Sequence, residues 1–482
     1  MCNQTHNKSM MSSLKIIFIT FLFALAPNVS FTQTEYFDTT QYNTEELKED
    51  FNLFRKKLET KAPLLYLYNS KGRTNFYLDS LYESIDHAMT PIEFFRLLAP
   101  INGFLKDQHT SIFPGTEMFN SVSEFPNLIP VDIELFGDQS LITFNFSSST
   151  QLEQGTEIVS INDVPCDEIM KTLHSIYNRD GYDMELPKQG INVDFWFYYH
   201  LLYGISPTYK FEFISGNGET RNCTVPGATM DKMDAILALT PKTKNEDREP
   251  GIYLEVIDSL KTGILSIEDY SSSTFKENQG KRYKQLVAEH FSTIEEKELS
   301  TLIIDVRGNR GGHPNNVKHT LKFLLDSPFE LITELRQVKK PNEESFDKRT
   351  KKRWYPTLGI GTFKPHKNNF KGKVIVLMNG ESLSATAELV SVLKRYNRAI
   401  FIGTMSGGNP IVLSGSLNKG YWELPNTKLK AFVPNKCQIL GNIELNTGFG
   451  LEPDYLIEHN INDILTNSDR TLLYAIGLIN SK

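Results

Sequence analysis

Residues 301–314, TLIIDVRGNRGGHP, lead from an apolar run through a glycine-rich turn to a proline that suits the first position of a helix. Residues 373–388, KVIVLMNGESLSATAE, repeat this order with an apolar run, a short turn and the start of an amphipathic segment. Short apolar runs that alternate with helical segments are typical of parallel strands joined by crossover helices. These two stretches therefore predict an α/β sheet in the second half of the chain.

The segments around these two stretches extend the pattern and set it apart from the first half of the chain. Residues 36–105 repeat apolar side chains at helical spacing, whereas residues 126–225 are mainly short alternating runs typical of strands, with one short helix expected at Cys166–Ile176. Residues 228–250 are polar and charged, as in a linker. The elements expected in the second half are strands at 262–267, 299–306, 373–379 and 399–403, helices at 280–297, 314–326 and 384–396, and a hairpin within 421–433.

The composition is that of an ordinary globular protein rather than a disordered, fibrous or coiled-coil one. The 482 residues are 40% apolar and 23% charged, and the length suits about three domains. With 51 basic and 58 acidic side chains, the formal charge of −7 gives no general attraction to nucleic acid or to anionic membranes. No HExxH pattern occurs, so the sequence carries no motif of this kind for binding zinc.

The N-terminal segment predicts export. Lys8 and Lys15 precede an apolar run from Ile16 to Ala26, which is too short to span a bilayer but suits a signal peptide. No later run of 18 apolar residues predicts a membrane span. We therefore expect the chain to act in the periplasm, the cell envelope or the medium after removal of residues 1–33.

The number of cysteines limits the disulfides that the chain can form. Cys2 leaves with the signal peptide, and Cys166, Cys223 and Cys437 remain. An odd number of cysteines excludes a complete disulfide framework. A single bridge from Cys166 to Cys223 stays open as an alternative to three free thiols.

Two turns and one loop contain residues suited to catalysis. The glycine-rich turn at 308–312 can present N–H groups to an oxyanion, although a tight strand–helix turn also needs glycine without any ligand. Ser384 starts a helix, where the macrodipole and the N–H of Ala385 favour an attacking hydroxyl, but most serines at helix starts only cap the helix. His109, in an upstream loop, could serve as the base, because the members of a catalytic triad occur in any chain order.

Taken in order, five segments resemble peptidase family S41, the tail-specific, carboxyl-terminal processing and tricorn-type proteases. Residues 106–110, KDQHT, resemble the family's Asp-Gly-His-Thr loop, and residues 155–163 resemble its PDZ signature. Residues 302–312 are similar to the strand and turn Ile-Asp-x-Arg-x-Asn-x-Gly-Gly, and residues 382–385, SLSA, to the Thr-x-Ser-Ala nucleophile turn. Residues 450–454, GLEPD, resemble the closing Gly-Val-x-Pro-Asp, and the order of all five makes the set specific.

The resemblance implies an α/β multidomain fold and a serine endopeptidase. It implies an exported enzyme that hydrolyses peptide or unfolded protein substrates through an acyl-enzyme, with no metal and no cofactor. The catalytic domain would be of the ClpP/crotonase-like type. The implied domains are a signal peptide (1–33), an N-terminal helical domain carrying His109 (34–122), a PDZ-like β domain (123–227), a linker (228–250) and an S41-like α/β peptidase domain (251–482).

The resemblance also implies a role for each matched residue. Ser384 would be the nucleophile and His109 the general base. The N–H groups of Ala385, Gly311 and Gly312 would form the oxyanion hole.

Three departures from the family pattern bear on the base. The turn at 403–409 has no lysine, which favours the tricorn-like Ser-His branch over the Ser-Lys dyad of bacterial processing proteases. Thr447 stands where tricorn-type sites carry a glutamate, so Glu444 nearby and Asp107 are also candidates to support the base. Gln108 replaces the glycine that usually precedes the histidine.

These departures leave a second hypothesis. The chain could be a catalytically weak or inactive protein that binds peptides or apolar ligands on the same fold, as the interphotoreceptor retinoid-binding proteins do. Retention of both Ser384 and His109 favours the enzyme. The sequence does not indicate an oligomeric state.

Overall fold

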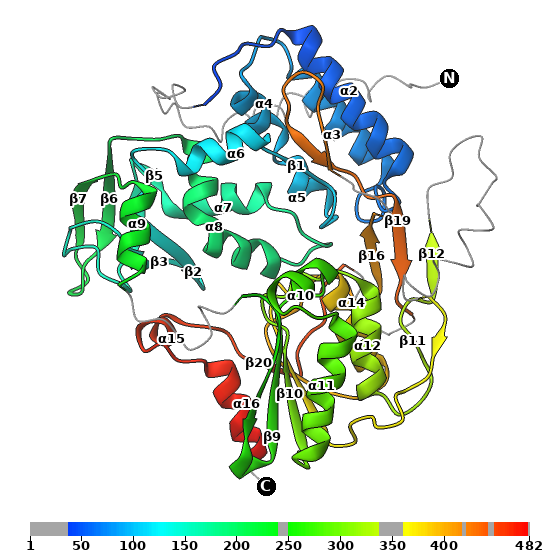
Figure 1. Ribbon diagram of the computed structural model, residues 1–482. Helices are drawn as coiled ribbons and strands as arrows, with labels where there is room; N and C mark the ends of the chain where they lie inside the picture. The colour runs from blue at the N-terminus through cyan, green and yellow to red at the C-terminus, as the bar shows by residue number, and fades with distance from the viewer. Residues whose placement is uncertain (1–36, 240–248, 337–359, 417–420, 442–447, 481–482) are drawn as a thin grey trace, which may run out of the picture.

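The computed structural model describes three packed parts of the chain. Helices gather at one end, a β-rich part lies beside them, and an α/β part forms the other end (Figure 1). Each part has a hydrophobic core of its own, so the mixed α/β architecture with several sheets agrees with expectation. The expected signal peptide and the middle of the expected linker lie outside the described residues, which are 37–239, 249–336, 360–416, 421–441 and 448–480.

The helical part forms because its apolar residues follow helical spacing and its helix starts carry capping side chains. In the first helix, Leu47, Phe51 and Leu58 are fully buried. The N-cap Asn43 forms a reciprocal capping box with Glu46, which fixes where this helix begins. The helices are α2 (Thr44–Lys61), α3 (Lys71–Glu83), α4 (Pro91–Leu98), α5 (Ile101–Leu105) and α6 (Thr116–Ser123).

The β-rich part is an antiparallel sheet in the order β2-β3-β4-β6-β7, packed against two helices. The expected helix is confirmed as α7 (Cys166–Ile176). Helix α8 (Glu185–Tyr203) was not expected, because residues 195–199, FWFYY, carry aromatic side chains that are typical of strands. The remaining elements are β2 (Val131–Phe136), β3 (Gln139–Asn145), β4 (Glu157–Ile161), β5 (Val164–Pro165), β6 (Thr208–Ile214), β7 (Thr220–Pro226) and α9 (Met230–Leu237), which lies within the expected linker.

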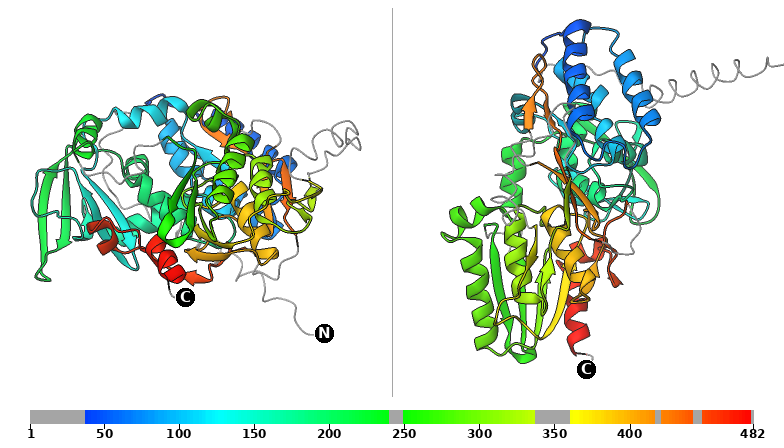
Figure 2. Two further views of the ribbon diagram at one scale, coloured as in Figure 1. Left: turned by 60° about the horizontal axis from the view of Figure 1, so that its bottom comes forward. Right: turned by 90° about the vertical axis from the view of Figure 1, so that its right-hand side faces the viewer.

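The α/β part is a six-stranded sheet in the order β20-β15-β14-β10-β9-β8. All neighbouring strands are parallel except β8 and β9, so the predicted parallel sheet is confirmed. Helices α11, α12 and α14 cover one face and α16 covers the other (Figure 2). The elements are β8 (Ile252–Ile257), β9 (Thr262–Ile267), α10 (Ser272–Asn278), α11 (Tyr283–Glu296), β10 (Thr301–Asp305), α12 (Pro314–Leu324), β14 (Lys373–Met378), α14 (Ala385–Arg395), β15 (Ile400–Gly403), β20 (Tyr455–Leu456), α15 (Ile461–Leu465) and α16 (Arg470–Asn480).

Small sheets bring distant segments together. The expected hairpin is confirmed, and its second strand pairs with β1 of the helical part, in the order β1-β18-β17. A second small sheet has the order β12-β19-β16. These strands are β1 (Ser111–Phe113), β17 (Tyr421–Glu423), β18 (Lys430–Phe432), β12 (Glu334–Arg336), β19 (Lys436–Ile439) and β16 (Val412–Gly415); β11 (Phe329–Glu330) pairs with β13 (Thr362–Phe363).

The cysteines of the described residues form no disulfide. Cys166, Cys223 and Cys437 are all free thiols. The Cys166–Cys223 bridge that the sequence left open is therefore absent, because Cys166 starts α7 while Cys223 lies in β7 opposite Phe211 of β6.

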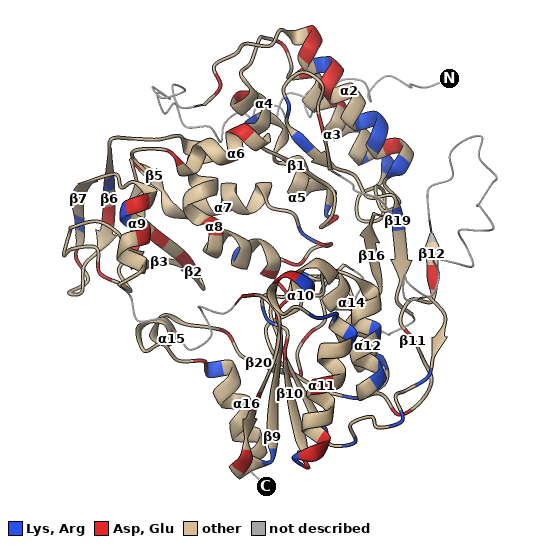
Figure 3. Ribbon diagram, in the orientation of Figure 1, with Lys and Arg blue, Asp and Glu red and all other residues tan. Residues whose placement is uncertain are grey.

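The surface carries both signs of charge. Figure 3 shows acidic and basic residues on the same elements, for example along α2. None of the helices in the described ranges is both long enough and apolar enough to cross a bilayer.

Candidate active site

Ser384 lies at the turn between β14 and α14 in a strained backbone conformation. Its φ of 53° and ψ of −119° are rare for a residue with a side chain and cost about 1–3 kcal/mol. An ordinary capping serine has an extended backbone and accepts a hydrogen bond from its own helix, whereas Ser384 does neither. The capping interpretation is therefore excluded. Strained strand-to-helix turns of this kind expose nucleophilic hydroxyls.

The glycine-rich turn after β10 touches this serine. A Cβ at Gly311 would lie 2.7 Å from the Ser384 Cβ and 2.8 Å from the Ala385 nitrogen, and Gly311 has a φ of 100°. Only glycine allows the two turns to approach this closely. The Asn309 side chain holds them together, because it accepts hydrogen bonds from the Gly311 N–H at 2.9 Å and from the Thr386 hydroxyl at 2.8 Å.

The backbone N–H groups beside Ser384 are not all free to donate a hydrogen bond to an oxyanion. Within the described part of the chain, the N–H groups of Ala385 and Gly312 have no acceptor. The Gly311 N–H, which was expected in the oxyanion hole, already donates to Asn309. Unpaired N–H groups at a helix start and in a glycine turn can stabilise developing negative charge.

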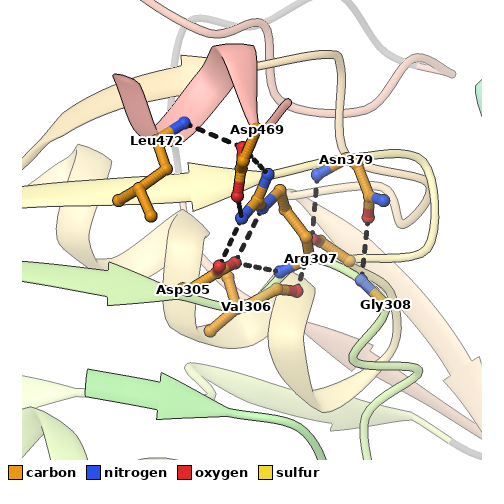
Figure 4. A network of polar contacts seen from close by, with 8 residues as sticks. Asp305, Val306, Arg307, Gly308, Asn379, Asp469 and Leu472 are labelled. Atoms are coloured by element: carbon orange, nitrogen blue, oxygen red, sulfur yellow. Dashed lines mark hydrogen bonds and ion pairs between the residues drawn. The ribbon is translucent and has the colours of Figure 1, made fainter. Parts of the chain in front are cut away.

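Asp305 and Arg307, which precede the glycine-rich turn, form a network of polar contacts next to the two turns. The Arg307 guanidinium donates to Asp305 at 2.6 and 2.9 Å and to Asp469 at 2.7 Å (Figure 4). The Gly308 N–H donates to the Asn379 side chain at 3.0 Å. These contacts tie the start of α16 and the end of β14 to the glycine-rich turn, so Asp305 and Arg307 are structural.

The imidazole of His109 is held by a serine that the sequence did not single out. The Nδ1 atom of His109 lies 3.2 Å from the hydroxyl of Ser414 in β16. The Ser414 hydroxyl donates to Asp107, which also accepts the Thr110 hydroxyl at 2.9 Å. A hydroxyl has one proton, so a Ser414 that donates to Asp107 can only accept from Nδ1–H. This places the histidine proton on Nδ1 and leaves Nε2 free to accept one.

The loop that carries His109 is fixed by the hairpin from the C-terminal half of the chain. Strand β1, which follows His109, pairs with β18, and the His109 and Phe432 rings are 6.4 Å apart. The tip of the hairpin is held by buried Asp50 of α2, which accepts the N–H groups of Asn426 and Thr427 at 3.0 and 2.8 Å. The position of the histidine therefore depends on contacts between parts that are remote in sequence.

Gln108 has a structural role at the same junction. Its side chain donates to buried Asp180 at 3.0 Å, and Asp180 also accepts the Asn409 N–H at 2.9 Å. Burial raises the pKa of Asp180 well above its usual range. The glutamine therefore links the histidine loop to the turn at 403–409.

One cavity brings the two sides of the site together. His109, Arg310 and Leu383 line the same cavity of about 250 Å³, and the last two residues directly precede Gly311 and Ser384. Burial lowers the pKa of His109, and Lys436 lowers it further, whereas Asp107 raises it. The imidazole is therefore kept neutral to lower pH than an exposed histidine.

A buried ionisable pair lies beside this site. Glu388, one helical turn after Ser384, accepts a hydrogen bond from Gln438 at 2.8 Å, and burial raises its pKa to about 8. Burial lowers the pKa of Lys436 in β19, and the charge of Glu388 opposes that shift. Neither residue was identified from the sequence, because a single charged residue in a short apolar segment is equally consistent with a solvent-facing position.

The structure leaves part of the expected site undescribed. Glu444 and Thr447, the two candidates to support the base near the C-terminus, lie outside the described residues. Asp107, the third candidate, lies next to His109 and reaches its ring through Ser414.

Part of the chain is similar in sequence to known peptidases. Residues 261–457 match peptidase family S41. The carboxy-terminal processing protease CtpB of Bacillus subtilis (strain 168) is 30% identical over 142 residues, which make up 29% of this chain and 25% of that protein. The chain thus matches about a quarter of the length of this curated relative.

Solved structures extend the likeness in fold to most of the chain. The crystal structure of mature CPAF gives a TM-score of 0.65 at 15% identity, over 91% of this chain and 98% of that one. A crystal structure of the cpaf s499a mutant gives a TM-score of 0.66 at the same identity and coverage. The sequence match to peptidase family S41 therefore covers residues 261–457, and the likeness in fold to mature CPAF extends over most of the chain.

Proposed function

We propose that this chain is a serine-type endopeptidase with Ser384 as nucleophile and His109 as general base. The observation that supports the proposal most strongly is the backbone of Ser384. A φ of 53° and a hydroxyl that does not cap its helix are costly for a purely structural serine. They are useful where a hydroxyl must face a substrate and an oxyanion hole.

The reaction would follow the acyl-enzyme route. The Nε2 atom of His109 takes the proton of Ser384, and the Ser384 oxygen attacks a peptide carbonyl. The N–H groups of Ala385 and Gly312 stabilise the oxyanion, while Gly311 supplies the space for the close approach. His109 then protonates the leaving amine, and a water molecule, deprotonated by His109, releases the acid and restores Ser384.

Asp107 would support the base through Ser414 rather than by direct contact. The carboxylate accepts the Ser414 proton, and Ser414 accepts Nδ1–H of His109. This chain of contacts selects the imidazole form with a free Nε2 and stabilises the imidazolium that forms during attack.

The remaining assignments follow from the same proposal. Residues 34–122 would form the helical domain, residues 123–227 a PDZ-like domain that binds peptide chain ends by strand addition, residues 228–250 a linker, and residues 251–482 a ClpP/crotonase-like catalytic domain. Peptides or unfolded proteins would be the substrates. The signal-like segment at 1–33 supports export to the periplasm, the cell envelope or the medium.

A fluorophosphonate probe tests the proposal directly. We expect labelling of the wild type, and loss of labelling in Ser384→Ala and in His109→Ala. Hydrolysis of a denatured protein should fall by about 10⁶-fold in both variants, the size found for the nucleophile and base of a serine-protease triad.

The controls are an exposed serine and an exposed histidine. Ser123→Ala and His87→Ala change surface residues of the helical part and should be labelled like the wild type. Failure of the wild type to react with the probe or to cleave any protein would overturn the proposal in favour of a binding protein on the same fold. Cleavage of a p-nitrophenyl ester without cleavage of protein would indicate an esterase.

A further inference from the structure

The cavity at the candidate site is lined by aromatic rings from both ends of the chain. Phe113, Tyr421 and Phe432 form one group, with ring centroids 6.3 Å apart for Phe113–Tyr421 and 4.8 Å apart for Tyr421–Phe432. Tyr177 and Tyr198 form a second pair at 5.5 Å. We name this cavity the aromatic pocket. Surfaces of this kind bind large apolar groups, because each ring offers a wide apolar face.

The aromatic pocket lies beside the reacting groups. The ring of His109 lines it, and so does Leu383, the residue before Ser384. Arg310 lines it next to Gly311, whose backbone touches Ser384. A side chain seated in the pocket would therefore belong to a residue next to the bond that is cut.

The charges of the aromatic pocket favour a neutral occupant. Its lining cation, Arg310, donates twice to Glu381, at 2.6 and 2.9 Å, and once to the Tyr177 hydroxyl at 3.3 Å. The ion pair with Glu381 offsets the charge of Arg310 and so weakens its attraction for a carboxylate of the substrate. Asp194 also lines the pocket and would repel an acidic side chain.

The size of the aromatic pocket limits its occupant to one side chain. At about 250 Å³ it is smaller than the roughly 300–1,000 Å³ of pockets that hold whole small-molecule ligands. We propose that the aromatic pocket is the subsite for a single large apolar side chain, such as Phe or Leu, on the residue next to the scissile bond of a peptide. This inference rests on the proposed peptidase function and names its substrate class.

A binding measurement tests the subsite separately from the chemistry. Peptides with a background of Gly, Ser and Asn would carry one variable residue (Phe, Leu, Ala, Asp or Lys) and compete with a fluorescent Leu peptide for the Ser384→Ala protein. We expect the Phe and Leu peptides to bind about 10- to 100-fold more tightly than the Ala and Asp peptides. Equal binding of all five peptides, or preference for Asp or Lys, would overturn the subsite.

Hydrolysis of the same peptides by the wild type separates the two proposals. Cleavage next to Phe or Leu, mapped by mass spectrometry, supports both. Selective binding by Ser384→Ala without any cleavage by the wild type would refute the peptidase and leave the subsite standing. Cleavage without preference for a large apolar residue would refute the subsite and leave the peptidase standing.

Two tyrosine variants provide a matched comparison. Tyr421 is 62% exposed, so Tyr421→Ala should fold, and removal of its ring should reduce the preference for Phe over Ala by severalfold. Tyr474→Ala, on α16 and away from the pocket, should leave the preference unchanged. Asp194→Asn should raise the affinity for the Asp peptide more than for the Phe peptide. An unchanged preference in Tyr421→Ala would contradict the assignment of the pocket.

Discussion

The nucleophile side and the base side of the site are built from different kinds of contact. Ser384 is held by two neighbouring turns, because β10 and β14 pair in parallel and the turns that follow them meet through Asn309, Gly311 and Thr386. His109 belongs to the helical part, and the serine that holds its ring lies 305 positions away.

The contacts that shape the Ser384 turn therefore differ from those that place the base. Asn309, Gly311 and Thr386 all belong to the α/β part. The contacts of His109 and of the strand that follows it join the helical part to the hairpin and to β16. Substitutions on the first side should therefore damage the reaction at its centre, whereas those on the second should weaken the base and leave the Ser384 turn intact.

Among residues that support the nucleophile or the base, the largest effect is expected from Gly311→Ala. The new Cβ would lie 2.7 Å from the Ser384 Cβ and 2.8 Å from the Ala385 nitrogen, so the two turns must separate. Loss of an aligned oxyanion donor costs about 10²- to 10³-fold in kcat, and we expect at least that loss here. Steady-state hydrolysis of a quenched Leu peptide measures it.

Gly280→Ala is the control for backbone strain alone. Gly280 also has a positive φ, 67°, but no atom of the part of the chain that the structure describes lies within 4 Å of the position of its Cβ. We expect a loss of about 1 kcal/mol in the free energy of unfolding and no change in kcat. An equal loss of activity in both variants would show that the close approach of Gly311 to Ser384 is unimportant.

The nucleophile side could be predicted largely from the sequence. Its parts lie in two contiguous stretches, and the order of apolar run, turn and helix fixes how they meet. Strand β9 was predicted at its observed bounds, 262–267, and the helix after Ser384 within one residue at each end. The strained φ of Ser384 was not predicted, since a serine at a helix start usually adopts the extended conformation of a cap.

The next effect in size is expected from Ser414→Ala. The change removes the contact between Asp107 and the His109 ring and leaves buried polar atoms without partners. We expect kcat to fall by about 10- to 100-fold while KM changes little, because Ser414 orients the base and does not line the pocket. Ser414→Thr retains the hydroxyl and should restore part of the rate.

Ser391→Ala is the matched control on the other side of the comparison. Ser391 is also buried, and its hydroxyl donates to the carbonyl of Pro410. It should lose stability without a fall in kcat. A normal kcat in Ser414→Ala would contradict the role of Ser414 in holding the base.

The base side could not be predicted in the same way. Its contacts join segments hundreds of positions apart, and neither Ser414 nor Lys436 stands out within its own short strand. The hairpin that carries β17 and β18 was predicted, but its pairing with β1 was not, because local patterns do not specify which distant edge a hairpin meets. Gln108 was noted only as a departure, and its contact with Asp180 shows the structural role of this glutamine.

A smaller effect is expected from Asp50→Ala, which releases the tip of the hairpin. Asp50 accepts the N–H groups of Asn426 and Thr427 and the Thr427 hydroxyl, at 2.7 to 3.0 Å. Loss of these buried partners should destabilise the hairpin by about 1–3 kcal/mol, and we expect kcat to fall by roughly 3- to 10-fold. Hydrogen exchange of residues 421–433 should increase.

Glu49→Ala is the control for Asp50→Ala. It tests whether the activity depends on the buried contacts of Asp50 or on any contact between α2 and the hairpin. Within the described residues, Glu49 accepts only an exposed contact from the Asn426 side chain at 3.1 Å, so we expect wild-type rates and exchange. Faster exchange of the hairpin in Asp50→Ala without any loss of kcat would show that the hairpin does not position His109.

The smallest effect is a shift in the pH profile. Burial and the charge of Lys436 lower the pKa of His109, so the acid limb of kcat/KM should lie below the ordinary histidine pKa of 6.5. Replacing the buried pair together, as Lys436→Met with Glu388→Gln, avoids leaving one charge unpaired. Removal of the positive charge should raise the pKa of His109 and move the acid limb up by less than about one pH unit.

Asp107→Asn should move the same limb the other way. The carboxylate raises the pKa of His109, so its removal extends the neutral form of the imidazole to lower pH even though the rate falls. The pH dependence of fluorophosphonate labelling should follow the same limb in each variant, because labelling needs the base but no peptide. Parallel shifts in both variants would mean that the limb reports a group other than His109, and the base side would then need another assignment.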